Sequence, residues 1–110
     1  MTLLYLNSDQ MGSGDPELGK KLLLIFLEKL AASDKQVDLV GCVNDGIKLT
    51  TEDGPALESL RKLEQKGAQI ATCGTCLDHH GLRDALKIGM VGTMDMTVEV
   101  MTTADRVIKL

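Results

Sequence analysis

Aromatic residues are nearly absent from this chain, and so is any concentration of basic charge. The 110 residues include no Trp, one Tyr (Tyr5) and one Phe (Phe26). The formal net charge is −4, and Lys and Arg form no cluster. Proteins that bind nucleic acids need a basic surface, and those that bind single strands add stacking aromatic side chains. We therefore exclude nucleic acid as a partner and expect a core of Leu, Ile, Val, Ala and Met.

Long apolar runs are also missing. No segment approaches the roughly 20 apolar residues of a membrane-spanning helix, so we expect no membrane association. The first ten residues, MTLLYLNSDQ, lack the basic start and the small-residue cleavage site of a signal peptide. We therefore predict a cytoplasmic protein, because the cytoplasm keeps thiols reduced. The length and the 44% apolar composition predict a single domain over residues 1–110.

Short apolar runs alternate with helical patterns along the whole chain. Strands are predicted at residues 2–7, 37–43, 68–72, 89–92 and 106–110. Helices are predicted at residues 16–32, 55–67, 82–88 and 93–104, while residues 44–52 are expected to form a loop. This alternation predicts an α/β fold with a mostly parallel sheet and right-handed crossovers.

The first predicted helix is apolar over more than one stripe. Leu18, Leu22, Ile25 and Phe26 define one face, and further leucines widen it. A helix that is apolar on several sides is covered on several sides. We expect this face to pack on the sheet, with a subunit interface as the alternative.

The fold class indicates where a site would lie. Ligands of open α/β sheets bind beyond the carboxyl ends of the strands, where the loops at 8–15, 44–52, 73–81 and 92–95 are expected to meet. The third of these loops begins with CGTC. Cys73 is expected to end a strand and Cys76 to begin a helix, whose N-terminus favours a thiolate and lowers its pKa. We therefore predict these two cysteines as the reactive residues.

A Cys-x-x-Cys pair in this position is compatible with several functions. It can be a dithiol redox couple, a metal site, a carrier of sulfur or selenium as a persulfide, a binding module without chemistry, or two packed thiols. The side chains of the adjacent His79 and His80 point apart, and the third cysteine, Cys42, lies on a strand, so we predict no metal. The segment GSGDPELG lacks the third glycine of the dinucleotide fingerprint, so we predict no nucleotide cofactor.

Other residues of these loops are candidates for substrate binding. Gly12 shapes a loop whose amides face the crevice, and Lys48 can stabilise a thiolate or an anionic donor, although a solvated lysine is an equal alternative. Met11 can line a soft pocket, and so can Met94 and Met96, although core packing accounts for any one of them. The predicted substrate-binding residues are Met11, Gly12, Asn44, Lys48, Gly74 and Thr75.

The chain resembles DsrE-like proteins in four stretches: NSDQMGSGDPELG, NDGIKLTTEDG, LEQKGAQIATCGTCLDHHGL and VEVMTTADRVIKL. More narrowly, it is similar to the DsrE-like domain of YedF-type selenium-metabolism proteins. The segment CGTCLDHHGL after a strand is the most specific element, and the resemblance covers nearly the full length. It implies a three-layer α/β/α fold around a five-stranded parallel sheet, and a homo-oligomer that is a trimer or a hexamer.

The resemblance also implies a function. In relatives that relay sulfur, the active cysteine follows a strand and precedes a glycine by eight residues, as Cys73 precedes Gly81. This implies Cys73 as the acceptor and Cys76 as its partner or resolver, although the helix start favours Cys76. His80 stands where such relatives have a basic residue. YedF-type proteins usually carry a TusA-like domain, which implies a TusA-like sulfur carrier as a partner.

The predicted function is therefore a sulfurtransferase-like carrier that holds sulfur or selenium as a persulfide or selenopersulfide. The alternatives are a non-catalytic oligomeric binding module of the same fold and a thiol-disulfide oxidoreductase.

Overall fold

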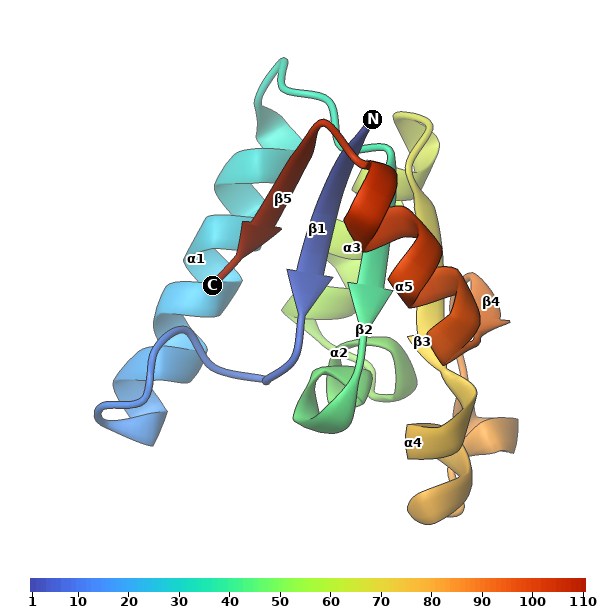
Figure 1. The fold of residues 1–110 in the computed structure, drawn as a ribbon. Helices are drawn as coiled ribbons and strands as arrows, with labels where there is room; N and C mark the ends of the chain where they lie inside the picture. The colour runs from blue at the N-terminus through green and yellow to red at the C-terminus, as the bar shows by residue number, and fades with distance from the viewer.

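A five-stranded sheet forms the centre of the molecule (Figure 1). The computed structural model describes residues 1–110. The strands are β1 (Thr2–Leu6), β2 (Leu39–Cys42), β3 (Gln69–Cys73), β4 (Met90–Gly92) and β5 (Arg106–Lys109). They lie in the order β4-β3-β2-β1-β5, and every neighbouring pair is parallel. This confirms the predicted α/β fold with a parallel sheet.

Helices cover the two faces of the sheet unequally. The helices are α1 (Pro16–Ala32), α2 (Lys48–Thr51), α3 (Pro55–Gln65), α4 (Gly74–His79) and α5 (Met94–Thr103). The first three cover one face through a core of 15 buried residues. On the other face α5 covers only three buried residues, Leu3, Leu39 and Ala71. The three-layer α/β/α architecture is thus confirmed, with one thick and one thin outer layer.

Residues 44–52, predicted to form a loop, are largely helical. They contain a 3₁₀ helix, η1 (Asn44–Ile47), followed at once by α2. The Ile47 carbonyl accepts the Thr50 hydroxyl at 3.1 Å, and the Thr50 and Thr72 hydroxyl oxygens lie 2.9 Å apart. The hydrogen bond between the Thr50 and Thr72 hydroxyls joins the helical segment to β3. Both hydroxyls are buried, and a buried hydroxyl without a hydrogen-bond partner would destabilise the fold.

The helix predicted over residues 82–88 is also displaced. The helical turns after β3 are α4, and only the short η2 (Arg83–Ala85) remains of the predicted segment. The chain turns at Gly81, whose φ is +65°. Glycine adopts this conformation freely, so α4 ends there and the following residues start a new direction.

Helix α1 buries the leucines that widen the predicted apolar face rather than most of the residues expected to define it. Leu18, Leu22 and Ile25 are 54%, 39% and 42% exposed, and Phe26 is half-buried. The residues that α1 buries are Gly19, Leu23, Leu27 and Ala31. The preceding loop sets this rotation, because the Met11 amide donates to the Gly19 carbonyl at 2.9 Å. None of the helices has the length and apolarity that crossing a membrane requires.

Candidate functional site

The turn from β3 into α4 holds both thiols of the Cys-x-x-Cys pair. Cys73 is the last residue of β3, and its Sγ accepts the Cys76 amide at 3.4 Å. Cys76 is the third residue of α4, and its own Sγ accepts the Asn44 amide at 3.2 Å. Each sulfur atom therefore has one backbone N–H directed at it.

Asn44 contacts Cys76 through an unusual backbone conformation. Its φ of +51° is the one positive value at a non-glycine residue of the chain. Asparagine tolerates this left-handed region better than most residues. Asn44 begins η1 shortly after β2, and Cys76 lies in α4 shortly after β3. Their contact therefore joins the segments that follow the carboxyl ends of these two strands.

Burial has the largest effect on the pKa of the Cys76 thiol. Burial raises this pKa above its ordinary value, and hydrogen bonding and charge from Cys73 raise it further. The Asn44 amide acts in the opposite direction without reversing the shift. The prediction that the helix N-terminus lowers the pKa of Cys76 is therefore wrong, because burial and the neighbouring Cys73 outweigh the backbone donors.

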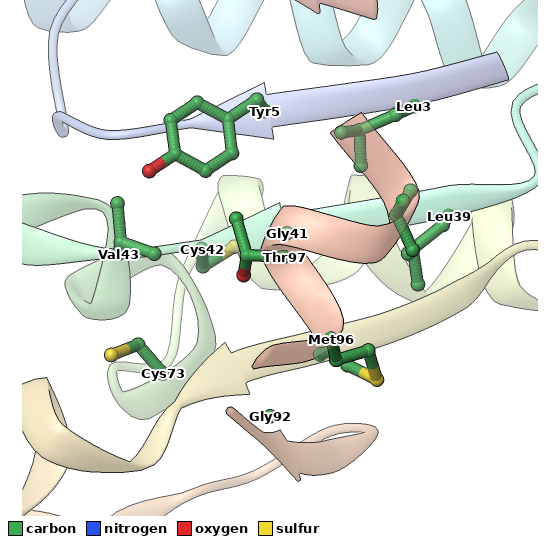
Figure 2. A pocket seen from close by; sticks show the side chains of 12 residues that line it. Leu3, Tyr5, Leu39, Gly41, Cys42, Val43, Cys73, Gly92, Met96 and Thr97 are labelled. Atoms are coloured by element: carbon green, nitrogen blue, oxygen red, sulfur yellow. The ribbon is translucent and has the colours of Figure 1, made fainter. Parts of the chain in front are cut away.

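The three cysteines differ in their access to solvent. Cys42 is 1% exposed, and burial raises its pKa to about 12, which confirms that it is a core residue. Cys73 is 7% exposed, whereas Cys76 is only half-buried. Cys76 is thus the more accessible thiol of the pair, and Cys73 lines a narrow cavity beneath α5 (Figure 2).

This cavity results from small residues on neighbouring strands. The strand register places Gly41 between Tyr5 and Ala71, and it places Gly92 beside Cys73. Gly41 has no side chain, and a hollow of about 20 Å³ remains under α5, whereas a Cβ at Gly92 would lie only 3.2 Å from Met96 Cε. The other lining residues are Leu3, Leu39, Cys42, Val43, Met96, Thr97 and Val100.

Tyr5 and Thr97 line this cavity and were not predicted from the sequence, whereas Met96 was named as a residue that can line a pocket. Residues alternate between the faces of a strand, so Tyr5 shares the face of Leu3 beneath α5. The sequence could have identified this residue, because Tyr5 is the one tyrosine of the chain and lies near the carboxyl end of the first predicted strand. No sequence pattern predicts that Thr97 lines the cavity, because its position depends on how α5 lies on the sheet.

None of the six predicted binding residues lines the cavity beneath α5, and three of them lie on segments that the cysteine pair does not contact. Met11 is half-buried and packs against the main core, and Gly12 is exposed with a φ of +76°. Lys48 Nζ forms ion pairs with Asp9 Oδ2 at 3.7 Å and with Asp45 Oδ1 at 3.9 Å. The loop at residues 8–15 runs beside α1, on the other side of the molecule from α4 (Figure 1).

The two other residues of the CGTC turn differ from each other. Gly74 is buried, and an added Cβ would lie 2.9 Å from both Arg83 Nη2 and Val91 Cγ1. Arg83 donates to the Asp78 carboxylate at 2.7 and 2.9 Å, which lowers the pKa of that carboxyl and ties α4 to η2. Thr75 is exposed at the start of α4. Gly74 thus permits close packing of the turn, and Thr75 is accessible to a ligand.

The histidines after the cysteines face outward. His79 and His80 are both exposed, and their rings meet edge to face with centroids 4.8 Å apart. No group of three His, Cys, Asp or Glu side chains in the chain is arranged to hold a metal ion.

The fold is similar to those of several solved structures. MTH1491, a protein of unknown function from Methanobacterium thermoautotrophicum, matches with a TM-score of 0.72 and 18% identity, over 99% of this chain and 97% of its own. The ychN protein from E. coli matches with a TM-score of 0.61 and 18% identity over the same shares. BT1422 from Bacteroides thetaiotaomicron, also of unknown function, has a TM-score of 0.63 and 15% identity over 99% and 94%. These likenesses show the fold.

Sequence comparison shows the family. No curated protein matches the chain. The DsrE/DsrF-like family, which relates in general to sulfur relay, matches over residues 10–110. Since this match covers nearly the whole sequence, the chain belongs to the DsrE/DsrF-like family.

Proposed function

We propose that this protein is a sulfurtransferase-like carrier that holds sulfur or selenium as a persulfide or selenopersulfide on Cys73. Cys76 is its partner thiol. The observation that carries the proposal is the pair of thiols at the end of β3, each accepting one backbone N–H. The general relation of the family to sulfur relay supports the same reading.

The transfer is an exchange that needs no oxidant. The Cys73 thiolate attacks the outer sulfur of a donor persulfide, R–S–SH. The donor S–S bond breaks while a bond forms between Cys73 Sγ and that sulfur. R–S⁻ leaves and takes up the proton that Cys73 released, so one thiol and one persulfide remain. Delivery to an acceptor thiol repeats the exchange in the same sense.

The proposed partners are further copies of this chain, as a trimer or hexamer, and a TusA-like sulfur carrier. Large apolar side chains exposed on the single chain support self-association. They lie on α1, β4, α5 and β5: Leu18, Leu22, Ile25, Met90, Val91, Met94, Val98 and Val107. Selenium in place of sulfur would use the same thiols, and a selenium donor would distinguish the two substrates.

Intact-mass spectrometry after incubation with inorganic polysulfide tests the proposal. The wild-type chain should gain the mass of one sulfur atom, and dithiothreitol should remove it. Cys73→Ser should gain none, whereas Cys42→Ala should behave as the wild type because Cys42 is enclosed in the core. A wild-type chain that gains no sulfur, or a Cys73→Ser variant that gains as much, contradicts the proposal.

A dithiol–disulfide couple is the second candidate function. The hydrogen bond from the Cys76 amide to Cys73 Sγ brings the two cysteines close within a single turn. Such a couple would lose two hydrogen atoms on oxidation and would reduce a test disulfide, while gaining no sulfur from polysulfide.

A further inference from the structure

The cavity beside Cys73 carries a polar group at the same end as the thiol. Figure 2 shows Tyr5 and Cys73 at the end of the cavity where β1 and β3 finish, with the Tyr5 hydroxyl directed toward that end. The side chains deeper in the cavity are apolar, among them Leu3, Leu39 and Val100. The mouth thus combines a sulfur atom and a phenol above an apolar floor.

The two hydroxyl groups of the cavity differ in their hydrogen bonding. Thr97 Oγ1 donates to the Thr93 carbonyl at 3.2 Å, so its proton is already engaged. The Tyr5 hydroxyl has no hydrogen-bond partner within the chain, and negative charge on Cys73 or Cys76 raises its pKa beyond the effect of burial. Tyr5 is therefore the free donor among the residues that line the cavity together with Cys73.

Building on the proposed carrier function, we propose that the outer sulfur of a Cys73 persulfide lies at the mouth of this cavity and accepts a hydrogen bond from the Tyr5 hydroxyl. Tyr5 is then a positioning residue that stabilises the persulfide anion.

The size and chemistry of the cavity fit this occupant. A hollow of about 20 Å³ exceeds the roughly 10–15 Å³ that one water molecule needs, and it is too small for a bulky organic group. The outer sulfur extends only about 2 Å beyond Sγ, the length of one S–S bond. The apolar lining gives contacts to a polarizable sulfur atom, and the Tyr5 hydroxyl supplies a donor for its charge.

The first test compares Tyr5→Phe with Thr102→Val, a change on α5 outside the cavity, after treatment with inorganic polysulfide. Peptide mapping locates the added sulfur, and its alkylation by iodoacetamide is followed against pH. Loss of the donor should raise the pH midpoint of this alkylation by about one unit in Tyr5→Phe, since a hydrogen bond to the charged form lowers a pKa. Thr102→Val should keep the wild-type midpoint, because Thr102 is exposed outside the cavity and its hydroxyl donates to the Val98 carbonyl at 2.8 Å.

The possible results separate this inference from the carrier function. An unchanged midpoint in Tyr5→Phe or an equal shift in Thr102→Val would overturn the role of Tyr5 and leave the carrier function in place. Sulfur found on Cys76 alone would overturn both the role of Tyr5 and the assignment of the acceptor to Cys73. A wild-type chain that takes up no sulfur would overturn both.

A second pair of variants tests the cavity itself. In Gly41→Ala the added methyl group meets Tyr5 Cδ1 at 3.7 Å and Leu3 Cδ1 at 3.9 Å, which are ordinary contacts that fill the hollow without strain. In the control, Gly14→Ala, the methyl group meets nothing within 4 Å. We expect Gly41→Ala to retain less sulfur on Cys73 than wild type and Gly14→Ala to match wild type. Equal retention by both variants would overturn the assignment of the cavity.

Discussion

Around the two sulfur atoms, single residues have opposing effects on charge. The backbone amide of Asn44 favours the Cys76 thiolate, whereas burial disfavours it. For Cys76 burial prevails, so its reactivity depends on exposure and on the contact with Asn44 rather than on a strongly acidic thiol.

Tyr5 reports on the charge of this pair, because it is the only tyrosine and the chain has no Trp. Burial, and then the negative charges of Cys73 and Cys76, raise the pKa of Tyr5. Removal of both thiols by Cys73→Ser with Cys76→Ser should lower this pKa while leaving it above its ordinary value. An ultraviolet titration of tyrosinate measures it. Cys42→Ala should have no effect, and an unchanged pKa in the double variant would place Tyr5 away from the pair.

The Cys76 thiol should ionise at a higher pH than an ordinary cysteine thiol. Its rate of alkylation by iodoacetamide, followed by peptide mapping, should reach its midpoint above the pH that is ordinary for a thiol. Because Cys73 contributes to the raised pKa, the midpoint should move down in Cys73→Ser. A wild-type midpoint below the ordinary value would show instead that the Asn44 amide outweighs burial.

At the scale of elements, η1 packs tightly against the end of β1. A Cβ at Gly46 would lie 2.1 Å from the Leu6 carbonyl oxygen at the end of β1. Gly46→Ala should therefore destabilise the fold by about 1–3 kcal/mol, the cost of overpacking. Urea unfolding followed by far-ultraviolet circular dichroism measures this loss.

The matched control for this variant is Gly14→Ala, where the added group meets open space. Its stability should stay within about 0.5 kcal/mol of wild type, as for most surface changes. Equal midpoints for Gly46→Ala and Gly14→Ala would contradict the tight contact between η1 and β1.

The elements also show what a sequence can predict here. The strands, the long helices and the place of Cys73 at the end of β3 follow from apolar runs that alternate with capped helices. The cavity does not follow, because it depends on the register of Tyr5, Gly41 and Ala71 across three strands. A shift of one residue would move each of these residues to the other face. The contact of Asn44 with Cys76 likewise depends on a positive φ that no local pattern predicts.

At the scale of the whole molecule, the thin layer and the exposed apolar residues favour association with further copies. Sedimentation velocity should give a trimer or a hexamer for the wild type. Leu22→Lys, which places a charge in the exposed stripe of α1, should reduce the size of the assembly. Glu28→Lys on another part of α1 should not. A wild-type chain that sediments as a monomer would contradict the expected oligomer.

The position of the added sulfur tests the central claim most directly. Wild-type protein treated with inorganic polysulfide is trapped with iodoacetamide, digested, and its peptides are weighed. The account predicts one additional sulfur on the peptide that contains Cys73, and its transfer to an added acceptor thiol. Added sulfur found only on residues other than Cys73, or no added sulfur at all, would contradict it.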